Sequence, residues 1–212
     1  MRDIPFFTTE NGVAEIVLRE IPYKKRAHIK LRATQEPEKL LDECVSFCRV
    51  CGAEQIYAAG HDFLEKYPLY VQMLEMTCTR ETVGKSDAAL VPVMDRDMEL
   101  WLQIHNGRMA EVPNAAYLDS KDGQEFLENG DCYFVHRDGK LLGIGKGAED
   151  RIDIVVAAEP GMGETVVRTL CSVLTGDRVR VAVAAENERA VRLYERMGFV
   201  CERMLSQWYQ IL

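Results

Sequence analysis

The hydrophobic and polar residues of the first eighty positions predict alternating strands and helices. Short stretches rich in apolar and β-branched residues favour strands, whereas apolar residues spaced by three and four favour helices. Gly52 follows the longest helical stretch and is the expected end of that helix. The predicted elements are strands at 14–19 and 28–32, a helix at 37–51, a strand at 55–58, a short helix at 62–67 and an apolar strand at 69–76.

A polar stretch, "TRETVGKSDA", separates this series from a second one. It contains Gly84 and few apolar residues, so we expect a domain boundary, with units at 1–84 and 85–212. In the second series, the pair Asp138-Gly139 is typical of a hairpin turn. The series comprises a strand at 88–94, helices at 95–108 and 119–128, a hairpin at 132–147, a strand at 151–158, a helix at 165–174, a strand at 181–185, a helix ending at Gly198 and a strand at 204–211.

The composition is that of a chain that folds into a globular protein. Of its 212 residues, 47% are hydrophobic and 28% are charged, unlike disordered chains. No apolar run is long enough to cross a membrane and the opening lacks a signal-peptide core, so we expect a cytoplasmic protein without a membrane partner. A net charge of -8 disfavours nucleic acid as a partner. Seven cysteines, an odd number, indicate reduced thiols.

The segment "IVVAAEPGMGETVVRTL" is the first candidate for chemistry. An apolar strand is followed at once by Gly161, Met162 and Gly163 and then by a helix, whose first N–H groups lack helical partners. Such a turn can bind an anionic phosphate, and Thr165 could add a hydroxyl. The alternative is a tight strand-to-helix turn without a ligand, because a single G-x-G motif is weak evidence.

The segment "VAVAAENERAVRLYERMGF" supplies a second candidate. Asn187 lies where a strand turns into a helix, a position at which Asn is a good N-cap. Tyr194 lies two helical turns later, on the same face as Ala190. Taken singly, Asn187 is explained as a cap and Tyr194 as a core residue. Their order after the glycine turn favours a shared site.

Residues 87–212 resemble the GNAT superfamily of acyl-CoA-dependent N-acyltransferases. The segment "NERAVRLYERMGF" is close to the N-x-x-A-x-x-L-Y-x-x-x-G-F pattern of that family. Gly161 and Gly163 fall on the glycines of its Q/R-x-x-G-x-G/A turn, with one helix and one strand between the two motifs. The resemblance implies an α/β fold with a GNAT-like mixed central sheet flanked by helices, to which residues 1–84 add a smaller α/β unit.

The resemblance also implies an activity. The protein would be an N-acetyltransferase that uses acetyl-CoA as co-substrate, requires no metal and transfers the acetyl group directly to a primary amine in a ternary complex. Asn187 and Ala190 would contact the pantetheine arm of the cofactor. The groups that would hold the coenzyme A phosphates are the backbone and hydroxyl donors of Gly161, Met162, Gly163, Glu164 and Thr165.

For the chemical step, the resemblance implies that Tyr194 lies near the cofactor sulfur and protonates the departing thiolate. An ordinary Tyr pKa of about 10 keeps this hydroxyl protonated at neutral pH. The strand residues Val155, Val156 and Ala157 would offer backbone N–H groups to the thioester carbonyl.

The base that takes the proton from the attacking amine is open among several carboxylates on or beside that strand. A carboxylate acting through water would suffice. Glu149 and Asp153 are our candidates, with Asp150 and Glu159 as neighbours. The acceptor, a small-molecule amine or a peptide amine, is expected between the loop at 108–117 and the N-terminal unit.

Two residues depart from the family's phosphate turn. Ala158 occupies the Gln/Arg position, and Pro160 removes one backbone donor. These departures favour an alternative from a different class, a non-catalytic acyl-CoA-binding or sensory module.

Two further motifs have competing explanations. Cys44, Cys48 and Cys51 have the spacing of radical enzymes that hold an iron–sulfur cluster, but they also follow helical spacing with Leu40 and Leu41, which favours a buried helix face. The segment "GIGKGA" mimics a dinucleotide-binding motif. A strand rather than a helix follows it, so its glycines indicate a bulge or a close backbone approach.

The N-terminal unit carries no catalytic pattern that we can read. Residues 52–73 have the same strand, short helix, strand rhythm as residues 176–204, so the unit could be a degenerate half-repeat of the same fold. The alternative is an unrelated α/β appendage.

The final strand could pair with the edge of a second copy, which makes a homodimer one expected assembly.

Overall fold

The computed structural model describes residues 3–212, and the chain folds as two compact units. Unit 1 comprises Met1–Met73 and Leu205–Leu212, and unit 2 comprises Leu74–Met204. The division therefore falls within β5 (Leu69–Thr79) and β11 (Val200–Gln210), whereas the polar stretch had suggested a boundary after Gly84. Val83, inside that polar stretch, is fully buried in the core of unit 2.

Unit 1 is a mixed sheet in the order β1-β2-β3-β4-β11, covered by one long helix. Neighbouring strands are antiparallel except β3 and β4, which are parallel and joined by α2. Near the C-terminus, Tyr209 lies opposite Ala58 of β4. The elements before β5 are β1 (Ile4–Thr9), β2 (Gly12–Val17), α1 (Ile21–Lys24), β3 (Arg26–Thr34), α2 (Pro37–Val50), β4 (Gln55–Ala59) and the 3-10 helix η1 (Asp62–Lys66).

Helix α2 buries the cysteine face that could also have suggested an iron–sulfur cluster. Pro37 occupies its first turn, where the missing N–H costs nothing. Cys44 and Cys48 are fully buried beside the strands of unit 1, and burial raises the pKa of both thiols to about 12. Leu40 and Leu41 are buried on the same side of α2 as these two cysteines, so the prediction of a buried helix face is confirmed.

Unit 1 buries a histidine between two aromatic rings. His28 of β3 is 8% exposed and lies between the rings of Tyr57 and Trp208, with centroids at 5.5 and 5.4 Å. Burial, with the nearby charges of Arg26 and Lys24, lowers the pKa of His28 from 6.5 to about 4. Because the folded state holds a neutral imidazole, the unfolded chain takes up this proton first as the pH falls.

We expect the stability associated with His28 to be present above about pH 6.5 and to be lost as the pH falls toward 4. At pH 5 this linkage lowers the free energy of unfolding by about 2 kcal/mol relative to pH 7. Urea unfolding at both pH values measures the loss, which should shrink in His28→Phe and persist in His61→Asn, an exposed histidine of the same unit. Equal losses in both variants would contradict the assignment.

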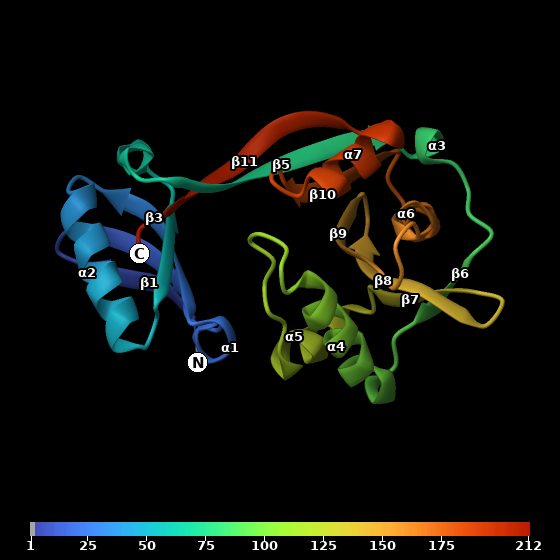
Figure 1. The fold of residues 1–212 in the computed structure, drawn as a ribbon, viewed down its shortest axis with the longest axis horizontal. Helices are drawn as coiled ribbons and strands as arrows, with labels where there is room; N and C mark the ends of the chain where they lie inside the picture. The colour runs from blue at the N-terminus through green and yellow to red at the C-terminus, as the bar shows by residue number, and fades with distance from the viewer. Residues whose placement is uncertain (1–2) are drawn as a thin grey trace. The chain divides into compact units, whose positions relative to one another are not determined.

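Unit 2 contains the second series in the predicted order β-α-α-β-β-β-α-β-α-β. Its sheet has the order β11-β5-β10-β9-β8-β7-β6 (Figure 1). None of the helices in residues 3–212 is long and apolar enough to cross a membrane. The elements are α3 (Arg80–Val83), β6 (Ala89–Pro92), the 3-10 helix η2 (Asp95–Asp97), α4 (Met98–Met109), α5 (Ser120–Asn129), β7 (Cys132–Arg137), β8 (Lys140–Ala148), β9 (Arg151–Ala157), α6 (Gly163–Leu170), β10 (Arg178–Ala184) and α7 (Glu188–Arg196).

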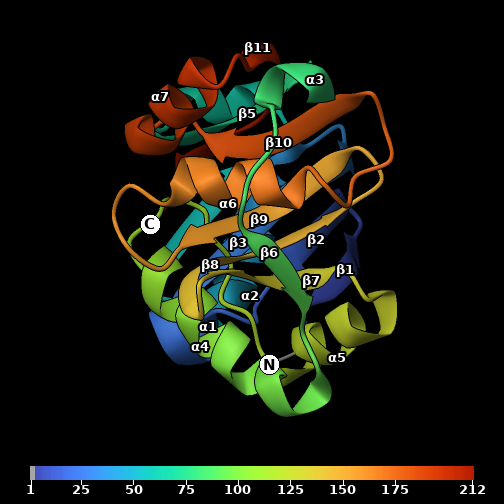
Figure 2. The same cartoon turned by 90° about the vertical axis from the view of Figure 1, so that its right-hand side faces the viewer.

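Helices cover both faces of this sheet. On one face, Val166 and Leu170 of α6 and Tyr194 of α7 form a core with the strands, and Figure 2 shows α6 lying along the strands. On the other face, Trp101 of α4 packs with Phe134 and other strand residues. The fold class predicted from the sequence, a mixed sheet flanked by helices, is confirmed.

The two units share one topology. The series β1-β2-β3-α2-β4-η1-β5 matches β7-β8-β9-α6-β10-α7-β11, and in both the crossover helix joins two strands, β3 to β4 and β9 to β10, that run parallel. The last strand of each series ends in the other unit, because residues 74–79 belong to unit 2 and Leu205–Leu212 to unit 1. This order supports the half-repeat rather than an unrelated appendage.

The glycines of "GIGKGA" allow α6 to pack directly on β8. A Cβ at Gly143 would lie 2.4 Å from the Val156 carbonyl oxygen and 2.6 Å from Val166, and one at Gly145 would lie 2.3 Å from Leu170. The register of β8 and β9 also shifts between Lys146 and Gly147. The prediction of a bulged strand with a close backbone approach is confirmed.

Candidate functional site

A cavity opens at the carboxyl ends of the parallel strands β9 and β10. The strands pair at Arg151 with Arg180 and at Ile152 with Val181, and the cavity of about 340 Å³ lies further along both. Crevices at the carboxyl ends of parallel strands are common ligand sites. The lining comes from the end of α4 and the loop after it (Arg108, Met109, Val112), the end of β9 (Val155, Val156, Ala157), the turn into α6 (Glu159, Pro160, Gly161, Gly163, Glu164) and α7 with its cap (Asn187, Arg189, Ala190, Leu193, Tyr194, Arg196).

The bulge between β8 and β9 determines which side chains of β9 face the core under α6 and which face the core under α4. Lys146 pairs with Ile154 and Gly147 with Ile152, so Asp153 is the extra residue. Ile152 consequently packs in the core with α6, whereas Ile154 packs with Trp101 on the opposite face. The bulge thus reverses the alternation of β9 before it reaches the cavity.

The turn into α6 presents unpaired donors to the cavity. Gly161 has φ +90°, a conformation that favours glycine. Met162 is the N-cap and provides no side-chain cap. Val166 donates its N–H to the Met162 carbonyl at 3.0 Å, so the N–H groups of Gly163, Glu164 and Thr165 precede the first helical bond. The side chains of Met162 and Thr165 are not part of the cavity wall.

Gly163 also fixes the distance between the two helices that border the cavity. A Cβ at this position would lie 2.9 Å from Leu193 of α7. The glycine therefore lets the start of α6 approach α7 closely, which brings both predicted motifs to one cavity.

Asn187 has the capping role that its position suggested, and its side-chain amide nitrogen is left without a partner in residues 3–212. Its side-chain oxygen accepts a hydrogen bond from the Ala190 N–H at 3.2 Å. The side-chain amide nitrogen has no hydrogen-bond partner within residues 3–212 and belongs to a residue that lines the cavity. The cap thus holds Asn187 in place while two N–H donors stay available to a ligand.

Tyr194 brings a protonated hydroxyl to the same wall. The residue is 6% exposed, and its ring lies 5.3 Å from that of Phe199. Burial raises the pKa of Tyr194 to about 12, so the hydroxyl stays protonated at neutral pH. It makes no hydrogen bond with the described part of the chain. The hydroxyl is therefore available to a ligand in the cavity.

The two carboxylates predicted as the base lie outside this cavity. Glu149 is in the turn before β9, where its carbonyl accepts the N–H groups of Thr175 and Gly176, about 20 Å along the chain from Val155 at a strand's rise per residue. Asp153 forms ion pairs at 2.8 Å with both Lys146 and Arg151. The bulge and these cations keep Asp153 away from the ligand-lining end of β9.

Arg108, which the sequence analysis placed only at the start of the acceptor loop, is a wall residue of this cavity. It lies at the end of α4, and its guanidinium donates a hydrogen bond to the carbonyl of Ala158. Ala158 is the position where the GNAT pattern has Gln or Arg, so a basic group from another helix reaches the place where the turn lacks one. Fifty positions separate the two residues, and no local motif signals their contact.

Comparisons with known proteins identify the fold. A scan of known protein families and a search of curated proteins find no match. Solved structures similar to this chain include a Staphylococcus epidermidis protein of unknown function (13% identity, TM-score 0.60, 99% of this chain and 92% of that one) and a GCN5-related N-acetyltransferase from Sphaerobacter thermophilus (12%, 0.55, 93% and 75%). A third is a tandem GNAT protein from the clavulanic acid biosynthesis pathway, solved without acetyl-CoA (12%, 0.54, 94% and 78%).

These similarities extend over nearly the whole chain rather than over unit 2 alone. The protein therefore has the GNAT fold.

Proposed function

We propose that this protein is an N-acetyltransferase that transfers an acetyl group from acetyl-CoA to a primary amine. One observation carries the proposal. The uncapped start of α6 and the unpartnered hydroxyl of Tyr194 line the same cavity, at the carboxyl ends of parallel strands in a GNAT fold. The first suits an anionic phosphate, and the second suits a group that becomes negatively charged during the reaction.

The phosphate end of the cofactor would lie at the turn into α6. The N–H groups of Gly163, Glu164 and Thr165 point from the positive end of the helix dipole. Arg108 adds a guanidinium, which offers several donors in a plane suited to phosphate. Arg189 and Arg196, both exposed on α7, also line the cavity. These cations support cofactor binding even though Ala158 and Pro160 depart from the family's turn.

The reacting end would lie between β9 and α7. Bound acetyl-CoA supplies an activated acyl group to the amine. The amide nitrogen of Asn187 would donate to the pantetheine arm beside Ala190. Backbone N–H groups of Val155 to Ala157 would donate to the thioester carbonyl oxygen, and Tyr194 would give its proton to the departing sulfur. The C–N bond forms as the C–S bond breaks, the excess proton of the amine passes to solvent water, and Tyr194 regains its proton from water.

Calorimetric titration with acetyl-CoA, repeated with desulfo-CoA, tests the binding part of this proposal. We expect saturable binding of both ligands. Arg108→Gln should weaken acetyl-CoA binding about tenfold, because it removes one charge-assisted contact to phosphate. Arg96→Gln, which changes an exposed arginine of the same unit outside the cavity, should leave the affinity unchanged. No binding of either ligand by the wild-type protein would refute the proposal.

A second candidate is a non-catalytic acyl-CoA-binding or sensory module. It is favoured by the absence from the cavity wall of both predicted bases. The two carboxylates that do line the cavity already have cationic partners, Glu159 with Lys140 at 2.9 Å and Glu164 with Arg168 at 2.7 Å. Acetyl-CoA binding without turnover against a broad panel of primary amines, including peptide amines, would favour this candidate over the enzyme.

A further inference from the structure

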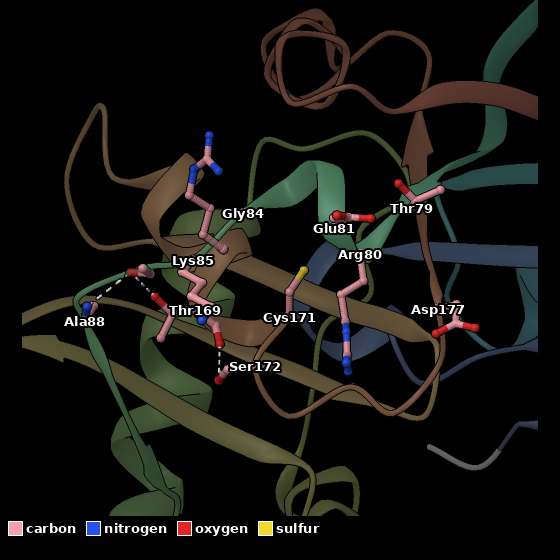
Figure 3. Close-up of a pocket in the computed structure, with 12 residues that line it drawn as sticks. Thr79, Arg80, Glu81, Gly84, Lys85, Ala88, Thr169, Cys171, Ser172 and Asp177 are labelled. Carbon is pink, nitrogen blue, oxygen red and sulfur yellow. Dashed lines mark hydrogen bonds between the residues drawn. The ribbon is translucent and has the colours of Figure 1, made fainter.

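A second, larger cavity lies at the other end of α6. It has a volume of about 730 Å³ and is bordered by residues 79–88, from the end of β5 to the start of β6, and by residues 168–177. Figure 3 shows its walls, with Arg80 and Glu81 from α3 and Thr169, Cys171 and Ser172 from the end of α6 and the residues after it. Cavities of roughly this size hold small organic molecules. The proposed function assigns it no role.

Three cationic side chains line this cavity although the chain as a whole is acidic. They are Arg80, Lys85 and Arg168. Arg80 donates to the carbonyl of Leu174 and has no carboxylate partner among residues 3–212, and Lys85 is exposed and has no ion-pair partner there. These two positive charges are therefore available to an anion.

The remaining polar groups suit a ligand that also carries hydroxyls. Glu81 and Asp177 line the cavity, and neither carboxylate has a cationic partner within the described chain. These carboxylates repel a bare anion and accept hydrogen bonds from hydroxyl groups. They therefore favour an anion that carries its own donors.

A network of hydroxyl groups keeps the wall between α6 and residues 84–88 in shape. Thr169, 2% exposed, lies at hydrogen-bond distance from Ser86, with 2.8 Å between the hydroxyl oxygens. Ser86 also accepts the Ala88 N–H at 3.1 Å, and Ser172 donates to the Thr169 carbonyl at 2.7 Å. The two walls are thus held together without filling the cavity (Figure 3).

One ion pair joins this cavity to the first cavity, to which the proposed function assigns acetyl-CoA. Arg168 of the second cavity donates from Nε and Nη2 to a single oxygen of Glu164, at 3.0 and 2.7 Å, and Glu164 lines the first cavity. Gly84 leaves room for the guanidinium, since a Cβ there would lie 2.6 Å from Arg168 Nη1. Arg168 thereby neutralises a carboxylate that stands beside the proposed phosphate turn.

We propose that the second cavity binds a small hydroxylated organic anion through Arg80, Lys85 and Arg168, and that this ligand weakens acetyl-CoA binding. A ligand oxyanion that engages Arg168 draws it away from Glu164, which leaves an unneutralised carboxylate beside the cofactor phosphates. By linkage, bound acetyl-CoA weakens the binding of the anion by the same factor. Anion binding is independent of the proposed function, whereas the coupling rests on it.

Two six-carbon probes that carry several hydroxyl groups, glucose 6-phosphate and gluconate, distinguish a phosphate from a carboxylate as the preferred group. Neither carries a primary amine, so neither can occupy the site as an acetyl acceptor. Titrated without acetyl-CoA, at least one should bind saturably, and neutral glucose should not. Lys85→Ala should weaken binding about tenfold through loss of one charged contact. Lys121→Ala, an exposed lysine outside the cavity, should not.

The coupling has its own measurement. Saturation with the bound probe should weaken acetyl-CoA binding about fivefold, within the range of allosteric couplings. Glu164→Gln should abolish this factor while the probe still binds. Failure of both probes to bind, or equal affinities in wild type and Lys85→Ala, would overturn the site. An unchanged factor in Glu164→Gln would overturn the coupling. If acetyl-CoA itself does not bind, the proposed function fails, and the probe titration still decides the second site.

Discussion

Replacing Tyr194 by Phe is expected to lower kcat about a hundredfold, the usual contribution of a general acid, with the Kd for acetyl-CoA almost unchanged. The hydroxyl is protonated at neutral pH and has no partner in residues 3–212, so its removal leaves no unpaired group in the protein. The thiolate would then depart without a proton donor. Steady-state kinetics with a competent amine, together with calorimetry of acetyl-CoA binding, measures both quantities.

Tyr133→Phe is the matched control for this experiment. Tyr133 lies on β7, outside the cavity wall, and its hydroxyl lies 3.4 Å from the Gly130 carbonyl oxygen. This variant should retain wild-type kcat and Kd. If Tyr194→Phe also keeps wild-type kcat, Tyr194 is not the acid. If Tyr194→Phe loses acetyl-CoA binding instead, the hydroxyl contributes to binding of the cofactor and not to the chemical step.

Replacing Gly143 by Ala is expected to lower the free energy of unfolding by about 3 kcal/mol, the upper range for overpacking a core. The added methyl group would meet the Val156 carbonyl oxygen at 2.4 Å and Val166 at 2.6 Å. The first contact is with backbone held in the sheet, which cannot move aside without disturbing the pairing of β8 and β9. Urea unfolding at pH 7 measures the loss.

Gly107→Ala provides the comparison. Gly107 lies in α4, and a Cβ there has no atom within 4 Å. Because Ala is the better helix former, this variant should be as stable as the wild type or more so, by up to about 1 kcal/mol. Similar losses in the two variants would mean that the close packing of α6 on β8 does not limit the stability of unit 2.

The variants bear on the proposed function in different ways. Loss of stability in Gly143→Ala would follow from the fold alone. Loss of turnover in Tyr194→Phe requires that the fold be used for acyl transfer. The acceptor amine decides between the enzyme and the non-catalytic module, and an amine screen is informative only once acetyl-CoA binding is established.

The sequence by itself determined most of the elements and the location of the proposed cofactor motifs, whereas β1, α1 and α3 were not predicted. Their signals are local: hydrophobic periodicity marks α2 and the strands of the sheet, and Asp138-Gly139 marks a turn in which both residues have positive φ. The glycine turn and the Asn187 cap are likewise properties of a few neighbouring residues. Periodicity and turn chemistry act over a handful of positions, so they can be read without knowing what packs against them.

Only the tertiary structure decided which distant residues meet. Arg108 reaches Ala158 across fifty positions, and Arg168 joins two cavities whose other walls come from separate segments. Residues 205–212 return to unit 1, and a single bulge at Asp153 directs that carboxylate to Lys146 and Arg151 instead of the cavity. Such contacts depend on how strands are ordered and how closely helices approach them, and no local pattern in the chain encodes either.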